Sequence, residues 1–289
     1  MVAMKFISFR RGGGPAKVGV LFDDRVVSLA GAGFADIFAV LAGGALARAK
    51  VDTWVYQPAA EDVLPLSSVK LMAPVPRPPK FICVGLNYRD HAAEAGMEIP
   101  KVPTIFSKFS NVVIGPGDPI VLPRNSTRPD YEAELAFVIG KGGRHIAAQN
   151  WREHVFGYTI VNDASARDFQ MATSQWLMGK TFDSFAPMGP ALVTEDEIPD
   201  PHALDINLEI GGEMLQSSNT RKLIFRIPEI IAHISSVVTL ETGDVVATGT
   251  PAGVGFARKP PRFLKAGEEV VIRIQGLGEL RNPCVDEVI

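Results

Sequence analysis

Residues 130–139, DYEAELAFVI, have the pattern of a β-strand that enters a hydrophobic core. Side chains alternate between the two faces of a strand, so Glu132 and Glu134 are expected on one face, roughly 6.5 to 7 Å apart. Two adjacent carboxylates on so apolar a strand lose hydration and repel each other unless a cation compensates. The pattern therefore favours a divalent metal site, with two solvated glutamates on an exposed face as the alternative.

Further β-rich runs lie on both sides of this stretch, at residues 81–84, 156–161, 206–210, 245–247 and 269–274. One strong helical pattern spans residues 227–238, where isoleucines recur at helical spacing. Strands mixed irregularly with a few helices predict an α+β fold that is mainly β, rather than a doubly wound fold with alternating strands and helices.

The N-terminal part predicts a smaller unit, with strands near residues 5–9, 18–22 and 26–29 and a helix over 35–49. Residues 73–80, APVPRPPK, contain four prolines and favour neither a helix nor a central strand. We therefore expect a small N-terminal α/β domain at residues 1–73 and a second domain at 74–289.

The composition argues against several classes of partner. The 289 residues are 46% hydrophobic with a net charge of −3, which predicts a soluble globular protein with no electrostatic surface for nucleic acid or an anionic membrane. The two cysteines, Cys83 and Cys284, are too few for a disulfide scaffold or a thiolate zinc site. The first 14 residues carry Lys5, Arg10 and Arg11 where a signal peptide needs apolar residues, so a cytoplasmic location is expected.

A third carboxylate, Asp163, follows the predicted strand at residues 157–163. It is either a metal ligand or a turn or N-cap residue. Ligation by carboxylates alone favours Mg²⁺ or Mn²⁺, with Ca²⁺ possible.

Two pairs of polar residues have helical spacing. His91 and Glu94 follow a turn at GLNYRDH, with Asp90 as the expected N-cap, so they share a helix face. A carboxylate in that position orients the imidazole and raises its basicity, which suits a general base; a surface pair is the alternative. Arg167 and Gln170 also share a face.

A capping box and two glycine-rich turns complete the local motifs. Ser165 with Asp168 resembles a variant capping box at the start of a helix. The sequence around Lys180, GKT, resembles the end of a phosphate-binding loop but lacks its first glycine. Residues 249–255, GTPAGVG, predict a tight turn in which the Thr250 hydroxyl could face a ligand.

Taken together, five motifs resemble the fumarylacetoacetate hydrolase family. They are GLNYRDH at 85–91, DYEAEL at 130–135, VNDASARD at 161–168, GKTFD at 179–183 and TGTPAGVG at 248–255, in the family's order. The resemblance covers residues 80–278. It implies a mixed β-sandwich roll with a small N-terminal domain, and a homodimer.

The resemblance also implies a set of site residues. The metal ligands would be Glu132, Glu134 and Asp163, with His91 and Glu94 as a water-activating pair and Lys180 as the active-site lysine. Lys108, Arg167, Gln170 and Thr250 would bind substrate. The animal fumarylacetoacetate enzyme has a fourth ligand, an aspartate, where this sequence has Val84. The site therefore resembles that of acylpyruvate hydrolases and oxaloacetate decarboxylases.

The expected function is hydrolysis of a C–C bond in a 2,4-dioxo acid of the acylpyruvate type, a small acidic 2-oxo acid. Decarboxylation of oxaloacetate, or isomerisation or tautomerisation of a 2-oxo acid, is the alternative on the same site. A noncatalytic metal-binding protein is a third hypothesis. The bulk of Trp176, Leu177 and Met178 suggests a substrate with an apolar or aromatic acyl group.

Overall fold

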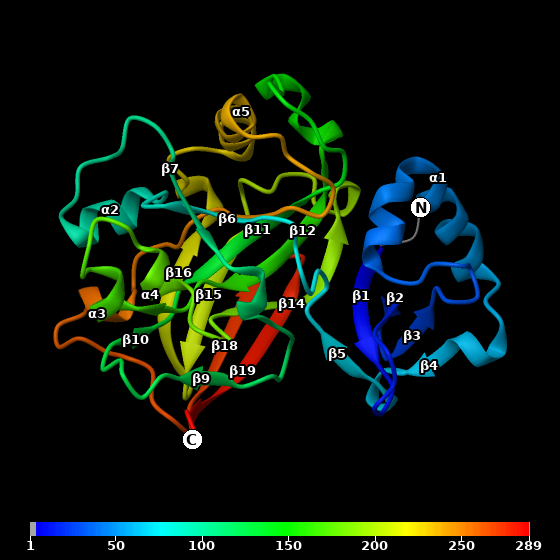
Figure 1. Cartoon of the computed structure of the whole chain (residues 1–289), viewed down its shortest axis with the longest axis horizontal. Coiled ribbons are helices and arrows are strands. Elements are labelled where there is room, and N and C mark those ends of the chain that lie inside the picture. The colour runs from blue at the N-terminus through cyan, green and yellow to red at the C-terminus, as the bar shows by residue number, and fades with distance from the viewer. Residues whose placement is uncertain (1–3, 289) are drawn as a thin grey trace.

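The computed structural model describes residues 4–288 and contains a large β-rich body with a smaller N-terminal part beside it (Figure 1). Three sheets of twelve, five and two strands are combined with a few helices. This confirms the predicted α+β, mainly β fold class.

The largest sheet runs through both parts of the molecule. Its main path is β4 (Val63–Pro65), β3 (Arg25–Ser28), β2 (Lys17–Phe22), β1 (Lys5–Arg10), β14 (Ala186–Thr194), β12 (Val155–Asn162), β11 (Ala133–Ile139), β17 (Val245–Ala247), β6 (Phe81–Gly85) and β7 (Thr104–Lys108). Two more strands join from the side: β5 (Lys70–Met72) pairs with β1, and β8 (Val113–Ile114) pairs with β14.

The second sheet has the order β16 (Glu213–Asn219), β15 (Asp205–Ile210), β18 (Glu269–Ile274), β19 (Gly278–Asp286) and β9 (Ile120–Leu122). A two-stranded pair joins β10 (Pro129–Asp130) to β13 (Ser165–Ala166). This small pair places the segments before Glu132 and after Asp163 next to each other.

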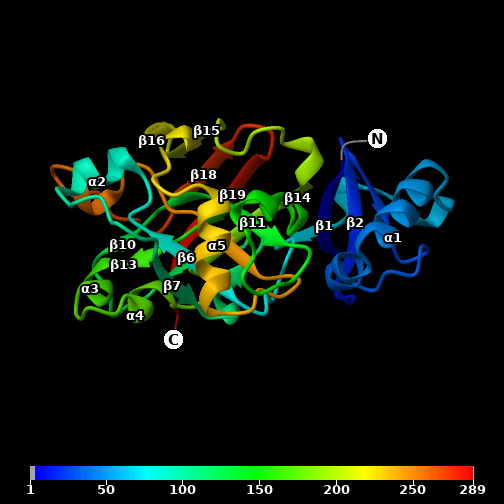
Figure 2. The same cartoon turned by 90° about the horizontal axis from the view of Figure 1, so that it is seen from above.

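The helices are α1 (Ile37–Tyr56), α2 (Arg89–Ala95), α3 (Arg167–Gln170), α4 (Leu177–Lys180) and α5 (Ile227–Val237). Short 3₁₀ helices are η1 (Ala60–Asp62), η2 (Leu66–Ser68), η3 (Ser110–Val112), η4 (Ala148–Glu153), η5 (Glu195–Glu197), η6 (Thr220–Lys222) and η7 (Gly255–Ala257). Figure 2 shows α5 lying across the middle of the molecule, while α2, α3 and α4 gather at the end away from the N-terminal part. The helix expected over residues 227–238 is confirmed in α5. The helix expected over 35–49 is α1, which begins at Ile37, has a kink at Gly44 and continues to Tyr56.

Strand β11 lies between two hydrophobic cores and is buried along its whole length. Leu135 and Phe137 belong to the core shared with the five-stranded sheet and α5. Ala136 and Val138 belong to the other core, which includes α1. Because a strand alternates its side chains, Glu134 points to the same face as Ala136 and Val138. The sheet therefore carries a carboxylate into the interior.

The N-terminal strands continue the central sheet, since Lys5 and Phe6 of β1 pair with Val193 and Leu192 of β14. The proline-rich segment 73–80 connects β5 to β6. The division into domains at residue 73 stays a prediction. In the described part of the chain, no helix is both long and apolar enough to span a membrane.

Candidate active site

The three predicted metal ligands lie together where β11 begins and β12 ends. Ala133 pairs with Asn162, and the backbone N–H of Asp163 donates to the carbonyl of Glu132 at 2.9 Å. One carboxylate oxygen each from Glu132, Glu134 and Asp163 lies within 4.8 Å of the others, and all three residues are buried. The antiparallel pairing thus brings together residues that are some thirty positions apart in the chain.

Buried cations surround two of these carboxylates. The ammonium nitrogen of Lys180 lies 2.7 Å from an oxygen of Glu132 and 2.7 Å from an oxygen of Asp163. The second oxygen of Glu132 lies 2.6 Å from Nη2 of Arg167. The second oxygen of Asp163 forms an ion pair with Lys108. Such pairs offset the cost of burying the carboxylates.

Lys108 was expected to bind substrate, and the structure places it behind the ligands. It is 3% exposed, and besides its ion pair with Asp163 it donates to the carbonyl of Ala164 at 3.0 Å. This geometry suits a residue that orients Asp163.

The third carboxylate, Glu134, is the least compensated. Burial would raise the pKa of Glu132, but Lys180 and Arg167 outweigh it and lower that pKa to about 2. Burial and the charges of Asp163 and Glu132 instead raise the pKa of Glu134 well above its ordinary value. One of its oxygens accepts from the backbone N–H of Gly249 at 2.7 Å. A further positive charge beside Glu134 would stabilise its ionised carboxylate.

The donor set fits a hard divalent cation. The three possible donors are all carboxylate oxygens and they converge in a buried space, which suits Mg²⁺ or Mn²⁺ better than zinc. The three residues can therefore bind a divalent metal. The geometry agrees with the ligand set that the resemblance implied.

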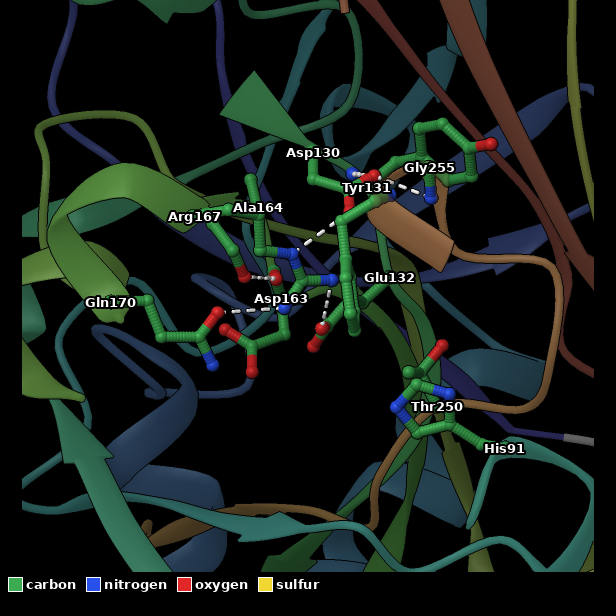
Figure 3. A network of polar contacts seen from close by, with 12 residues as sticks. His91, Asp130, Tyr131, Glu132, Asp163, Ala164, Arg167, Gln170, Thr250 and Gly255 are labelled. Carbon is green, nitrogen blue, oxygen red and sulfur yellow. Dashed lines mark hydrogen bonds and ion pairs between the residues drawn. The ribbon is translucent and has the colours of Figure 1, made fainter. Parts of the chain in front are cut away.

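A cavity of about 460 Å³ opens beside the carboxylates. Its polar lining comprises His91, Glu132, Glu134, Arg167, Gln170, Lys180 and Thr250. Its apolar lining includes Val84, Leu86, Met97, Phe106, Trp176 and Phe256. Figure 3 shows His91 and Thr250 across an open space from Asp163 and Gln170. Seven of the predicted site residues thus share one cavity.

His91 lies on α2 with its ring largely buried and faces Glu94. Nδ1 of His91 is 3.5 Å from Oε2 of Glu94. Both oxygens of Glu94 accept from the backbone N–H of Gly253 at 3.0 Å, which holds the carboxylate in place. The predicted pair on one helix face is therefore present.

Asp90 is not the N-cap that the sequence predicted, because the helix begins at Arg89 and the N-cap is Tyr88. Its carboxylate accepts from the N–H of His91 at 2.9 Å and from Ser218 at 2.7 Å, and it pairs with Lys222 at 2.9 Å. The Asp90 carboxylate thus ties α2 to β16 and η6. The sequence contained no signal for this because the partners are 128 and 132 residues away.

Arg167 and Gln170 share a face of α3, as predicted, and Nη1 of Arg167 donates to Oε1 of Gln170 at 2.8 Å (Figure 3). Nε of Arg167 donates to Asp130 at 2.8 Å. Asp130 also accepts from the backbone N–H groups of Gly255 and Phe256. The local sequence at Asp130 indicates only the start of a strand, so this role was not predicted.

The predicted capping box of Ser165 and Asp168 is wrong. Ser165 belongs to β13, so the helix starts only at Arg167, and the serine hydroxyl donates to the carbonyl of Asp163 at 2.9 Å. The Asp168 carboxylate instead accepts from Ser126 at 2.7 Å and from the N–H of Thr127 at 2.9 Å. Pairing between β10 and β13 took precedence over the local cap.

Thr250 lines the cavity as expected. Its position depends on Gln216, which was not predicted from the sequence, and on Gly249 of the predicted turn. Nε2 of Gln216 donates to the Thr250 hydroxyl at 2.8 Å. Gly249 has φ +99°, and a Cβ there would lie 2.8 Å from the Cβ of Asn87. The turn therefore needs glycine.

The apolar wall was predicted only in part. Trp176 lines the cavity, whereas Met178 is 63% exposed and lies outside it. Val84 occupies the cavity wall at the position of the absent fourth carboxylate. Phe106, two residues before Lys108, and Phe256, directly after the motif at 248–255, also line the cavity and were not predicted to do so.

Comparison with known proteins places this site in a family. Residues 80–285 match the fumarylacetoacetate (FAA) hydrolase C-terminal family. The chain belongs to this family. The match starts at the end of the proline-rich segment and includes all ten predicted site residues, so the predicted resemblance is confirmed.

The family includes curated relatives of high similarity. Oxaloacetate tautomerase Fahd2a, mitochondrial, from Rattus norvegicus is 53% identical over 224 residues, covering 77% of this chain and 72% of the relative. Oxaloacetate tautomerase FAHD2A, mitochondrial, from Homo sapiens is 52% identical over 225 residues, with the same coverage of 77% and 72%.

Solved structures from the family share the whole fold. Fumarylacetoacetate hydrolase from Exiguobacterium antarcticum has a TM-score of 0.84 at 35% identity and covers 98% of this chain and 100% of its own. Maleylpyruvate hydrolase from Sphingobium sp. SYK-6, in complex with manganese(II) ion and pyruvate, has a TM-score of 0.83 at 30% identity, covering 99% and 100%. A 2-hydroxyhepta-2,4-diene-1,7-dioate isomerase from Mycobacterium marinum has a TM-score of 0.79 at 31% identity, covering 99% and 100%. The family is thus one of enzymes, with both hydrolases and isomerases among this chain's neighbours.

The relatives also correct one prediction. A cytoplasmic location was expected, but the rat and human relatives are named as mitochondrial proteins. The cytoplasmic prediction is therefore contradicted. The homodimer stays a prediction.

Proposed function

We propose that this chain is a metal-dependent enzyme that interconverts the keto and enol forms of a small 2-oxo acid, with oxaloacetate as the first probe. The observation that carries the proposal is the single cavity in which His91 and Lys180 lie beside three convergent carboxylates. The names of relatives at 52–53% identity support it and move tautomerisation ahead of the hydrolysis favoured by the sequence analysis.

The carboxylate cluster would bind the head group of the substrate through a metal. When bound to Glu132, Glu134 and Asp163, a divalent ion would act as a Lewis acid that stabilises an enolate. Oε1 of Gln170 accepts from Arg167, which leaves the amide N–H groups of Gln170 for a substrate oxygen. The Thr250 hydroxyl lies in the same cavity and supplies a second polar contact.

Proton transfer would use His91 and Lys180. A neutral His91 removes a proton from C3, the electrons of that C–H bond form a C2–C3 double bond, and the carbonyl electrons move to the C2 oxygen. Lys180 donates a hydrogen bond to this oxygen, which takes up a proton from solvent to complete the O–H bond of the enol. The imidazolium of His91 returns its proton to solvent, and ketonisation is the reverse. Glu94, 3.5 Å from Nδ1 of His91, stabilises the imidazolium.

Lys180 suits the donor role. Burial would lower its pKa, but the carboxylates of Asp163 and Glu132 raise that pKa above the usual value for lysine. The side chain therefore remains an ammonium group that can donate to negative charge as it develops on oxygen.

Hydrolysis of a 2,4-dioxo acid is the second candidate, and the His91–Glu94 pair favours it. With a water in the cavity, His91 would take a proton from the water as its oxygen attacks the 4-carbonyl. Cleavage of the C3–C4 bond would then release a carboxylic acid and the pyruvate enolate. The maleylpyruvate hydrolase structure with manganese(II) and pyruvate supports this alternative.

A two-substrate assay tests the proposal. Metal-stripped protein is incubated with oxaloacetate or with acetylpyruvate, with and without Mg²⁺ or Mn²⁺, and keto–enol conversion and products are followed by absorbance and NMR. We expect metal-dependent interconversion of oxaloacetate tautomers. Acetate plus pyruvate from acetylpyruvate would establish hydrolysis instead, and pyruvate from oxaloacetate would establish decarboxylation.

Matched variants distinguish the site from background chemistry. Glu134→Gln removes a proposed ligand, whereas Glu213→Gln changes a glutamate whose side chain is 62% exposed. We expect only the first to abolish metal-dependent turnover. A metal that raises the melting temperature with no turnover of any 2-oxo acid would support the noncatalytic metal-binding hypothesis and reject the proposal.

A further inference from the structure

Two aromatic rings extend from the carboxylate cluster along the cavity wall. The ammonium nitrogen of Lys180 lies 5.1 Å from the centre of the Phe106 ring. Phe106 in turn packs edge to face against Trp176, with ring centres 5.5 Å apart and an interplanar angle of 73°. Since Lys180 also contacts Glu132 and Asp163, the wall leads from the carboxylates to an indole.

The position of the indole depends on a glycine. A Cβ on Gly85 would lie 2.3 Å from the Trp176 ring, closer than any real contact. The φ angle of Gly85 is not in the left-handed region, so its backbone alone does not require glycine. The end of β6 instead lacks a side chain where Trp176 packs, and this contact fixes the ring at the cavity wall.

The remainder of this wall is apolar as well. Leu86 and Met97 line the cavity with the two rings. Methionine is flexible and polarizable and makes favourable contacts with aromatic rings. A planar apolar group in this part of the cavity would therefore be surrounded by suitable contacts.

A second substrate carboxylate would find no free cation here. Among the residues of 4–288 that line the cavity, the only Lys or Arg side chains are Lys180 and Arg167. Lys180 is paired with Glu132 and Asp163, and Arg167 is paired with Asp130 and Glu132. A carboxylate on C3 of the substrate would lose hydration without forming a new ion pair, which is unfavourable.

We propose that the wall formed by Phe106 and by Trp176 on Gly85 selects 2-oxo acids that carry an aryl group on C3 over those that carry a small alkyl group or a second carboxylate. This inference rests on the proposed function for the head-group chemistry and adds the substrate class. Turnover of oxaloacetate tests whether the site enolises a 2-oxo acid. The aromatic wall determines which substituent on C3 of the substrate is preferred.

Proton exchange at C3 tests the selectivity. The metal-loaded full chain is placed in D₂O with phenylpyruvate, 2-oxobutyrate or oxaloacetate, and loss of the C3 proton signal above background is measured by NMR. We expect kcat/KM for phenylpyruvate to exceed that for 2-oxobutyrate by about tenfold or more, the scale on which apolar pockets discriminate. Equal values for the three acids would overturn the proposal.

Three variants locate the selectivity. Trp176→Ala is expected to reduce the ratio of phenylpyruvate to 2-oxobutyrate exchange about tenfold, and Trp176→Phe to restore most of it. Leu177→Ala, the adjacent residue outside the cavity lining, controls for disturbance of the segment. An unchanged ratio in Trp176→Ala contradicts the proposed wall even if exchange itself persists.

A charge variant provides the reciprocal test. Met97→Arg introduces a cation at the wall and should shift preference toward oxaloacetate. Met214→Arg is its control, because Met97 is 51% exposed and lines the cavity, while Met214 is 48% exposed and does not line it. A similar shift in both variants would assign the effect to general charge and overturn the proposal.

Equilibrium binding separates this proposal from the proposed function. Calorimetric titration with phenylpyruvate and 2-oxobutyrate, in the presence of Mn²⁺, needs no turnover. Tighter binding of phenylpyruvate that is lost in Trp176→Ala supports the wall even if no acid exchanges its proton, an outcome that would reject only tautomerisation. Equal binding of both acids, with exchange of both, would reject only the wall.

Discussion

The ammonium nitrogen of Lys180 lies 2.7 Å from a carboxylate oxygen of Asp163, and the two side chains, 17 residues apart in the chain, are almost completely buried. The same nitrogen contacts Glu132 at the same distance. Lys180 thus compensates two proposed metal ligands from the side of the cavity. A cation that binds there shares these carboxylates with the lysine.

Replacing the lysine should therefore have opposite effects on folding and on metal binding. We expect Lys180→Met to destabilise the metal-free protein by about 3–5 kcal/mol, because it leaves buried carboxylates uncompensated. Mn²⁺ should bind more tightly than in wild type, because the competing ammonium is gone. Thermal denaturation with and without Mn²⁺ measures both effects, with exposed Lys17→Met as control. Unchanged stability in Lys180→Met would show that the ion pairs contribute little.

Removing a proposed ligand should weaken metal binding without unfolding the protein. Glu134→Gln eliminates the least compensated of the three carboxylates. We expect the affinity for Mn²⁺ to fall by roughly 100-fold or more, because loss of a residue that only contacts a metal ligand already has an effect of up to that size. Isothermal titration of metal-stripped protein provides the measurement. Retention of wild-type affinity in Glu134→Gln would place the metal elsewhere.

Loss of the proposed base should affect the chemical step and spare the metal. His91→Ala is expected to lower kcat by about 100- to 10,000-fold, the usual contribution of a general base. Glu94→Gln should lower it less, because Glu94 acts through His91. Mn²⁺ titrations run beside the oxaloacetate and acetylpyruvate assays check that binding persists. If His91→Ala lost only acetylpyruvate hydrolysis and kept tautomerisation, its role would be water activation alone.

The tether between α2 and the body should depend on pH. Burial would raise the pKa of Asp90, but hydrogen bonds from Lys222 and Ser218 outweigh it and lower the pKa below its ordinary value of 3.8. A lowered folded-state pKa contributes stability that is present above the unfolded pKa and is lost as the pH falls through the folded pKa. Asp90→Asn should therefore cost about 1 kcal/mol near neutral pH and nothing in strong acid.

Urea unfolding of wild type and Asp90→Asn across the acidic range measures that difference. The Lys222→Met variant, which removes the partner of Asp90, should reduce the same pH dependence. A difference between Asp90→Asn and wild type that stays constant down to the lowest pH would show that the carboxylate charge is not involved.

The packing of Trp176 on Gly85 predicts a local and visible change. Gly85→Ala should displace the indole, at a cost of about 1–3 kcal/mol for overpacking, and should shift tryptophan fluorescence toward longer wavelength. Gly13→Ala is the control, since a Cβ there meets no atom within 4 Å. Wild-type fluorescence and stability in Gly85→Ala would mean that the ring does not depend on the missing side chain.

The sequence predicted local structure correctly where the hydrophobic spacing agreed with the tertiary contacts of the segment. The isoleucines of residues 227–237 formed an amphipathic helix because their spacing matches a helical face. The prediction was wrong for Ser165 and Asp168, because a short strand pair joined Ser165 to Asp130 and delayed the helix. In that region, tertiary pairing outweighed a local capping preference.

For the site, the sequence by itself determined the chemical types of the proposed ligands and the shared strand face of two of them. Glu132 and Glu134 follow from an alternation of side chains that holds in any strand, and the spacing of His91 and Glu94 follows from the helix repeat. These relations act over four residues or fewer, so a single chain segment contains them.

Only the tertiary structure decided what surrounds these groups. The contact of Lys180 with Glu132 joins residues 48 positions apart, and that of Asp90 with Lys222 joins residues 132 positions apart. The packing of Trp176 on Gly85 likewise spans separate elements. Such contacts depend on strand pairing and on core packing across the whole chain. They leave no pattern in a short segment of sequence from which they could be predicted.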